Sequence, residues 1–598
     1  LEHAGYRPEQ LEPDRVGVFV GCSNNGYYRR IEGQLQAADY SAGIGNQNPI
    51  IANRVSFLLN LRGPSVLVDT LCSSSLVSLH MACQSIRQGE CSAAIAGGVN
   101  LQLSPEYYVG MSRMKVHSPT GQCYAFDERA DGIVLGEGAG AVLLKPLAQA
   151  VADGDRIYGV IKGSAVNNDG RTNGLTAPNP ASQADVIRTA LDNAGVSAET
   201  ISYVEAHGTG TTLGDPIEIE GLTKAFRVDT DQNQFCAIGS VKTNLGHLES
   251  AAGIAQFIKV LLSLQHQQVP PSLNFDRSNP YIPFDTSPFV VNNQLQHWES
   301  TTPRRAGISA FGMGGTNAHV IVEEAPAPAI NQNTVDRSHH LLMLSAKSEQ
   351  ALAELVDRYH RLLSHQPDLS LADLCFTANT GRVQFNERLG IVTDSISDLT
   401  AQLTAYRQQQ LTPNIYRGSS QKKSTAKIAY LFTGQGSLSV RMGRQLYETQ
   451  PTFRQAIAAC AVLMEPHLDQ PLLSILYPVN GRNELIDRTI YAQPALFALE
   501  YALFKLWQSW GITPDAVLGH SLGEYVAAVV AGVMSLADGI KLVTTRARLM
   551  QNLPVAGEMV AVFATPANIQ KAIEIDGRQL TFAVYNSPEN TVIAGDKQ

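Results

Sequence analysis

The sequence predicts a multidomain α/β protein, and three observations support that fold class. With 598 residues the chain is too long for one hydrophobic core, and this length is typical of about three or four domains. Strand-like apolar runs alternate with helical patterns over most of the chain. The composition changes at a Pro/Ala-rich stretch that begins at Ala325 and is typical of a linker.

The first predicted domain spans residues 1–322 and is rich in Gly, Ala and Val. One helical face of apolar residues lies within Val186–Ala194, and Gly195 supplies the stop signal. Its clearest strand-like runs are Val16–Val20, Ala141–Leu144 and Tyr203–Ala206. Strands that alternate with helices predict sheets covered by helices on both faces.

The rest of the chain divides at Ile428. Residues 323–427 predict a linker followed by a small α/β adapter domain, in which Glu349–Leu363 is the clearest helix. The strand-like run Ile428–Phe432 then opens a third domain, residues 428–598. Because the chain starts without an initiator Met and stops just after a strand-like run, we expect both ends to be cuts inside a domain.

Composition excludes several classes of protein. Apolar residues at 44% and charged residues at 17% are typical of a soluble globular protein, and no apolar run is long enough to span a membrane. The net charge of −9 argues against nucleic acid as a partner. The eight cysteines include no C-x-x-C pair, so we expect a cytoplasmic protein with neither a metal site nor disulfides.

Cys72 is the first candidate catalytic residue. It follows the strand-like run Val66–Val68 and precedes a helical face formed by Leu76, Leu79, Cys83 and Ile86. A helix N-terminus stabilises a thiolate, so this position predicts a pKa below the usual value of about 8.5. The alternative is a small buried apolar residue.

Two histidines lie at the ends of predicted strands, His207 within Glu205–Thr211 and His247 within Lys242–His247. Cysteine with one histidine would fit a thiol hydrolase. Two neutral imidazoles that donate to one carbonyl oxygen would instead stabilise the enolate formed by decarboxylation of a malonyl unit. The strand–turn–strand segment Ile308–His319 is suited to offer a backbone N–H as half of an oxyanion hole.

Four segments in this order resemble the β-ketoacyl synthase domain of modular type I polyketide synthases: Asp69–Ser75, Glu205–Thr211, Lys242–His247 and Phe311–His319. The resemblance covers residues 1–322. It implies a thiolase-like fold, a five-layer α-β-α-β-α sandwich, and a homodimer. It also implies that Cys72 carries the acyl chain, that His207 and His247 promote decarboxylation, and that Lys242 supports the site while Phe311 gates it.

Ser521 is the second candidate. The G-x-S-x-G segment Gly519–Gly523 lies between a strand-like run and the helical pattern Glu524–Ala531, which is the context of a nucleophile elbow. A serine nucleophile needs a general base, normally histidine, yet no histidine follows Ser521. Either this serine is inert or its base lies beyond Gln598.

The third domain resembles the acyltransferase domain of the same synthases in Phe432–Gly436, Gln493–Ala495, Gly519–Gly523 and Asn586–Pro588. The resemblance implies an α/β-hydrolase-like domain followed by the start of a ferredoxin-like subdomain. Ser521 would carry the extender acyl group, with the backbone N–H groups of Gln435 and Leu522 as its oxyanion hole. Arg546 would grip the extender carboxylate. Family members with an aliphatic residue where this chain has Leu522 usually take malonyl-CoA rather than methylmalonyl-CoA.

Together the two resemblances imply polyketide chain extension by decarboxylative Claisen condensation. The expected partners are malonyl-CoA and an acyl carrier protein, whose phosphopantetheine arm presents the substrate; no cofactor is expected to bind the chain directly. A type I fatty acid or polyunsaturated fatty acid synthase shares this chemistry. A thiolase is disfavoured because it has cysteine where this chain has His247, and a non-condensing scaffold module usually lacks a catalytic residue.

Overall fold

The computed structural model describes residues 1–11, 15–23, 26–27, 40–327, 337–410, 412–420, 427–478, 484–553, 557–573, 575, 577 and 579–596. They form two compact units, one within residues 1–419 and the other within residues 420–598. The linker predicted to begin at Ala325 runs into residues 328–336, which lie outside the described residues. No helix in the described part of the chain is long and apolar enough to cross a membrane.

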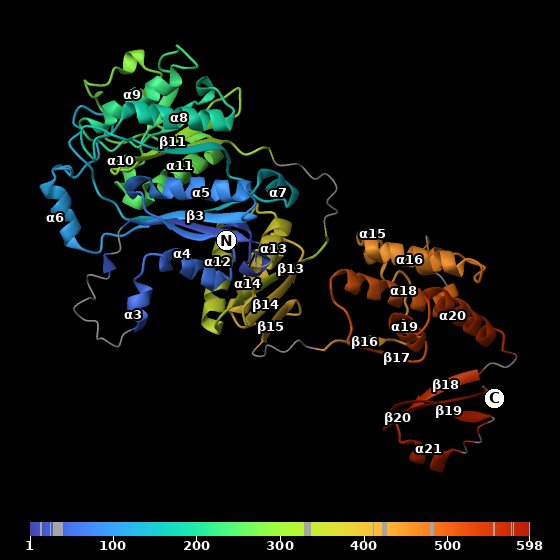
Figure 1. Ribbon diagram of the computed structural model, residues 1–598. Helices are drawn as coiled ribbons and strands as arrows, with labels where there is room; N and C mark the ends of the chain where they lie inside the picture. The colour runs from blue at the N-terminus through green and yellow to red at the C-terminus, as the bar shows by residue number, and fades with distance from the viewer. Residues whose placement is uncertain are drawn as a thin grey trace. The chain divides into compact units, whose positions relative to one another are not determined.

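Two β-sheets form the centre of the first unit (Figure 1). The first sheet has the order β2 (Ser65–Val68), β1 (Val16–Gly21), β3 (Ala93–Asn100) and β4 (Gly138–Leu144). The second sheet has the order β5 (Val160–Asn168), β12 (Thr316–Glu323), β11 (Arg305–Phe311), β6 (Tyr203–Glu205), β7 (Cys236–Gly239) and β9 (Phe289–Val291). The strands predicted at Val16, Ala141 and Tyr203 are confirmed.

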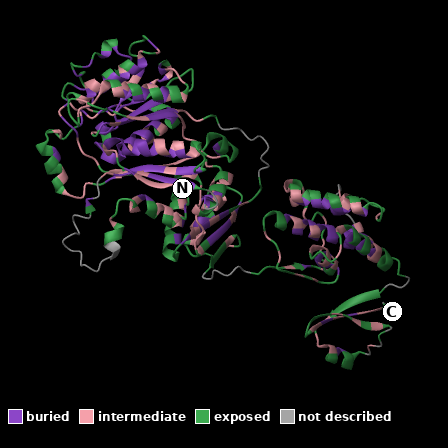
Figure 2. Ribbon diagram, viewed as in Figure 1, coloured by how far each residue is buried: buried purple, intermediate pink, exposed green. Residues whose placement is uncertain are grey.

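Helices separate and cover these sheets in five layers. The central layer holds α5 (Ser74–Arg87) and α11 (Ala252–His266), which contact both sheets. The outer layers hold α4 (Ile50–Leu59) on the first sheet, and α8 (Pro180–Ala194) with α9 (Gly214–Phe226) on the second. Figure 2 shows that buried residues predominate in the strands and central helices, with partly buried residues among them. The predicted α-β-α-β-α sandwich is confirmed, including the helix stop at Gly195, whose φ is +65°.

Parallel strands bring distant motifs to one edge of the second sheet. β11 and β7 both run parallel to β6, so the carboxyl ends of all three strands lie at the same edge. Phe311 ends β11, His207 follows β6, and the segment Lys242–His247 follows β7. The predicted strand, turn and second strand within Ile308–His319 are the antiparallel pair β11 and β12.

The adapter segment has its own core within the first unit. Its antiparallel sheet has the order β13 (His340–Ala346), β14 (Glu387–Thr393) and β15 (Ile415–Ser419), and its helices are α12 (Glu349–His365), α13 (Leu371–Thr380) and α14 (Ile396–Arg407). Arg382 in this segment donates a 2.9 Å hydrogen bond to the carbonyl oxygen of Glu2. The adapter segment therefore packs with residues 1–327. The domain boundaries predicted at residues 322 and 427 stay predictions.

In the second unit, β16 (Ala429–Phe432) pairs in parallel with β17 (Ala516–Gly519). Their helices are α16 (Pro451–Met464), α18 (Thr489–Ser509), α19 (Gly523–Val530) and α20 (Leu536–Gln551). The elements that follow are β18 (Gly557–Val562), α21 (Pro566–Ala572), β19 (Leu580–Ser587) and β20 (Asn590–Asp596). The three strands form an antiparallel sheet with β20 in the middle. This β-α-β-β order is the start of a ferredoxin-like subdomain, as the sequence predicts.

Candidate active sites

Cys72 lies in a tight turn between β2 and α5. The turn is a 3-10 helix, Leu71–Ser73, in which Leu71 has a φ of +56° that non-glycine residues seldom adopt. Ser74 fixes the turn, because its hydroxyl accepts from the Thr70 N–H at 2.9 Å and donates to the Leu71 carbonyl oxygen at 2.6 Å. The predicted placement of Cys72 at a helix start is confirmed.

The predicted lowering of the Cys72 pKa is wrong. The side chain is buried, and burial raises the pKa of its thiol to about 12. The Glu249 carboxylate raises it further, and the opposing contributions of the Met313 backbone N–H and the Lys242 charge are smaller. Cys72 is therefore a thiol at neutral pH, despite its position at the helix start.

His207 and His247 lie side by side as neutral hydrogen-bond donors. Their ring centroids are 5.6 Å apart with the rings nearly perpendicular. Desolvation and the positive charge of Lys242 hold the pKa of both imidazoles well below 6.5. The Phe311 N–H donates to His207 Nδ1 at 3.3 Å, and the Glu249 N–H donates to His247 Nδ1 at 2.9 Å. Each neutral ring therefore carries its proton on Nε2.

Lys242 anchors the loop that carries His207. Its side chain is 1% exposed, and its ammonium donates to the carbonyl oxygen of His207. The Glu218 carboxylate accepts hydrogen bonds from the N–H groups of His207 and Gly208, both at 2.7 Å. Burial raises the pKa of Glu218 to about 7, and Lys242 opposes this shift. Lys242 was predicted to support the site, and in the structure it contacts the backbone of His207.

The turn after β11 offers the backbone N–H that the sequence predicts without naming its residue. Phe311 is buried, packs at a ring-centroid distance of 5.7 Å from His207, and donates its N–H to that ring. The backbone N–H that interacts with the Cys72 sulfur belongs to Met313, two residues later. The role of Phe311 as a gate stays a prediction, and Met313 is a site residue that sequence reasoning missed.

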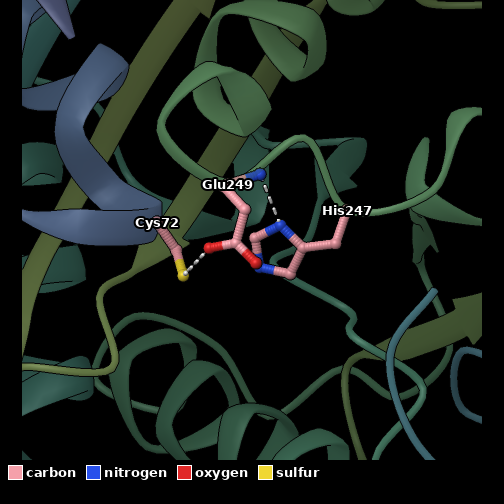
Figure 3. Close-up of side chains that lie close together, drawn as sticks. All are labelled: Cys72, His247 and Glu249. Atoms are coloured by element: carbon pink, nitrogen blue, oxygen red, sulfur yellow. Dashed lines mark hydrogen bonds between the residues drawn. The ribbon is translucent and has the colours of Figure 1, made fainter. Parts of the chain in front are cut away.

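Glu249 is a second residue that sequence reasoning missed. The Cys72 Sγ donates to Glu249 Oε2 at 3.7 Å, and the cysteine sulfur, a His247 ring nitrogen and a Glu249 carboxylate oxygen lie within 4.8 Å of one another (Figure 3). The only sequence signal was its place two residues after His247. Cys72 therefore has a carboxyl neighbour, Glu249, as well as the His247 imidazole.

Ser521 sits on the predicted elbow between β17 and α19. Its φ is +52°, the strained conformation that such an elbow requires. A Cβ placed on Gly434 would lie 3.4 Å from the Ser521 Cβ, so the loop that carries Gln435 runs directly beside this serine. The side chain of Leu522 is fully buried in the core of the unit, and the role of its backbone N–H in an oxyanion hole stays a prediction.

A chain of amides holds Arg546. Its guanidinium donates to Gln493 Oε1 at 2.6 Å, and Gln493 Nε2 donates in turn to Gln435 Oε1 at 3.1 Å. Gln493 is fully buried, so its own end of each contact is shielded from water. The structure thus joins the predicted residues Gln435 and Arg546 through Gln493, to which the sequence analysis assigned no role.

No hydrogen bond engages the Ser521 hydroxyl among the residues that the structure describes. The neighbouring His520 points its Nε2 to Asn586 Oδ1 at 2.9 Å, which ties the elbow to β19. His520 is thereby directed to the small sheet, and the prediction of a general base outside this sequence remains untested.

Comparisons with known proteins agree with these two sites. Residues 1–150 and 158–276 match the N-terminal and C-terminal domains of β-ketoacyl synthases, and residues 429–598 match an acyl transferase domain. Residues 340–403 match a CurL-like C-terminal segment of polyketide synthases. A ketosynthase from module 6 of the bacillaene synthase of Bacillus subtilis 168 is 38% identical with a TM-score of 0.64, over 78% of this chain and 77% of that one. The chain belongs to the polyketide synthase family of β-ketoacyl synthases.

Relatives cover the whole chain. A phenolphthiocerol/phthiocerol polyketide synthase of Mycobacterium tuberculosis is 43% identical over 602 residues, and the PKS-NRPS hybrid synthetase acdB of Aspergillus candidus is 42% identical over 618. The chain spans 32% of the first relative's length and 24% of the second's. This polyketide synthase chain therefore carries a ketosynthase domain and an acyltransferase domain, which makes it a transferase.

Proposed function

We propose that this chain extends a polyketide by one malonyl-derived unit. In the ketosynthase domain, Cys72 holds the acyl chain as a thioester, and a malonyl group on an acyl carrier protein loses CO₂ to give an enolate. The Nε2–H groups of His207 and His247 donate hydrogen bonds to the enolate oxygen and keep their protons, and the enolate carbon attacks the Cys72 thioester. In the acyltransferase domain, Ser521 transfers the malonyl group from malonyl-CoA to the carrier.

One observation carries this proposal: two adjacent imidazoles are both fixed as Nε2–H donors by backbone N–H groups on their Nδ1 atoms. A thiol hydrolase needs an imidazole that accepts the proton of its cysteine. Two neutral donors suit a developing oxyanion instead. Lys242 keeps this pair in place through the backbone of His207.

For the acyltransferase domain, the support is the link from Arg546 through Gln493 to the loop beside Ser521. In this proposal the guanidinium holds the free carboxylate of the extender, while the N–H groups of Gln435 and Leu522 hold its thioester oxygen. The phosphopantetheine arm of the carrier presents the substrate. The ketosynthase domain forms a homodimer. All eight cysteines are free, which fits a reducing cytoplasm.

The test is to incubate the chain with an acylated carrier protein and a malonylated carrier protein and to identify products by mass. We expect a β-ketoacyl carrier protein and one equivalent of CO₂. Replacement of Cys72 with Ala should remove the product while malonyl decarboxylation continues, because the two histidines remain. If the unaltered chain became acylated on Cys72 but formed no β-ketoacyl product, it would be a non-condensing module and the proposal would fail.

A further inference from the structure

Acyl loading on Cys72 releases a proton that needs an acceptor. Because burial and Glu249 keep this residue a thiol, the proton must leave as the sulfur attacks the incoming thioester. The two imidazoles lack a free acceptor atom for it. Both Nδ1 atoms already accept a backbone N–H, and both Nε2 atoms already carry a proton.

The Glu249 carboxylate is the acceptor that faces the sulfur. Cys72 Sγ already directs its proton to Glu249 Oε2 at 3.7 Å (Figure 3). Glu249 is 8% exposed, and its Oε1 has no hydrogen-bond partner among the described residues. A buried carboxylate with unused acceptor capacity is a stronger base than one in water.

Three other titratable groups influence the Glu249 carboxylate. Cys72 and the Tyr107 hydroxyl are donors beside it, and the charge of Lys242 favours its ionised form. Burial raises the pKa of Tyr107 and so keeps that hydroxyl protonated, whereas burial raises the pKa of Glu249 above its usual value. Burial therefore makes the carboxylate more basic, while the charge of Lys242 opposes this shift.

We propose that Glu249 is the general base for acyl loading: it takes the Cys72 proton and returns it to the departing thiol. This inference deepens the proposed ketosynthase function and rests on it. The Cys72 sulfur forms a bond to the thioester carbonyl carbon while its proton moves to Glu249 Oε2. The bond from that carbon to the phosphopantetheine sulfur then breaks, and the proton passes from Glu249 to the leaving thiolate. No oxidant or further reactant is needed.

In this assignment the two reaction steps, decarboxylation and acyl loading, use different side chains. The imidazoles of His207 and His247 only donate, which suits the enolate step, and Glu249 only accepts, which suits the loading step. The two steps therefore depend on different residues. Loss of Glu249 should slow acyl loading and leave decarboxylation unaffected.

The test uses the full 598-residue chain with Glu249→Gln, which keeps the shape and removes the basic oxygen. Three rates are measured: Cys72 acylation by an acylated carrier protein, followed by intact mass; decarboxylation of malonyl carrier protein; and Cys72 alkylation by iodoacetamide. General bases contribute about 10²–10⁴-fold, so acylation should fall by at least about 100-fold. Decarboxylation should stay within about 3-fold of the wild-type rate, because the imidazole donors of that step remain. Alkylation also requires the thiol to lose its proton, so it should slow at pH 7 together with acylation and recover as the pH rises, because hydroxide then replaces the missing base.

Two further variants sharpen the result. Tyr107→Phe removes the other polar neighbour of the carboxylate and should leave acylation nearly unchanged. Glu249→Asp keeps a carboxylate at a longer distance and should restore part of the acylation rate. Acylation of Glu249→Gln at the wild-type rate would overturn the inference, and so would a parallel loss of acylation, decarboxylation and alkylation.

The wild-type chain separates this inference from the proposed function. If the wild type yields β-ketoacyl product while Glu249→Gln acylates normally, condensation stands and the base is wrong. If the wild type acylates in a Glu249-dependent way but gives no product, the base stands and condensation is wrong.

Discussion

Gly312 lies where the hairpin of β11 and β12 meets the Cys72 turn, and an added methyl group there should displace the cysteine. A Cβ at Gly312 would lie 2.5 Å from the Thr70 carbonyl oxygen, 3.0 Å from Ser73 Oγ and 3.1 Å from the Thr316 carbonyl oxygen. Ordinary contacts begin at 3.4 Å, so Thr70 would have to retreat by about 1 Å. Overpacking of this size costs about 1–3 kcal/mol, and a displacement of about 1 Å can slow a reaction about 100-fold.

The assay is the rate of Cys72 acylation by an acylated carrier protein. Gly314→Ala is the matched control, because a Cβ there would meet only Leu71 Cδ1, at 3.6 Å. We expect Gly312→Ala to acylate about 30–100 times more slowly than wild type and Gly314→Ala to stay within about 3-fold. Equal rates for Gly312→Ala and wild type would refute this reading of the turn. Equal damage by both variants would show that the hairpin as a whole, not the contact with Thr70, controls Cys72.

Three further predictions concern the acyltransferase site and the stability of the first unit. Arg546→Ala should lower malonyl loading by about 10–100-fold relative to acetyl loading, because a charge-assisted pair is worth about 1.5–3 kcal/mol; equal falls would contradict this role. The chain should load malonyl-CoA faster than methylmalonyl-CoA, as Leu522 predicts. The two substrates are compared in competition, and faster loading of methylmalonyl-CoA would contradict the prediction. Burial lowers the pKa of His319 from 6.5 to about 3, so its stabilising contribution is lost as the pH falls below about 6.5, by about 3 kcal/mol at pH 4. In urea unfolding, His319→Gln should therefore be less sensitive to acid than wild type, and unchanged acid sensitivity would contradict the assignment.

The sequence was sufficient to place the two histidines of the ketosynthase site at the ends of strands. Strand patterns placed His207 and the segment Lys242–His247 after strands, and these strands are parallel neighbours whose ends meet at one edge. Such predictions succeed because a strand of alternating or continuous apolar residues is a local property. The elbow at Ser521 was predictable for the same reason, since a strand, a G-x-S-x-G turn and a helix follow one another directly.

The protonation of Cys72 could not be predicted in this way. A helix start is visible in the sequence, but the residues that bury and charge the thiol come from elsewhere. Glu249 is 177 positions away in the chain, and its carboxylate raises the pKa that the helix start alone would lower. Desolvation depends on the whole fold, which no local pattern contains.

The turn after β11 shows a second kind of limit. A strand, a glycine turn and a strand predict that some backbone N–H reaches the site, but the turn geometry decides which one. The Phe311 N–H donates to His207, and the Met313 N–H interacts with the Cys72 sulfur. The N–H that reaches the sulfur therefore belongs to a residue two positions beyond the end of the strand.

Leu522 and Arg546 would influence substrate choice in different ways, the leucine through packing and the arginine through contact. Its side chain is fully buried in the core, so it cannot touch the extender from that position. An effect on malonyl preference would have to act through packing under the elbow, and so through the backbone position of Ser521. Arg546 differs in kind, since its guanidinium ends at the buried amide of Gln493, beside the loop that lies against the serine. In the proposed function the guanidinium contacts the extender itself, whereas the leucine can only adjust the position of the serine.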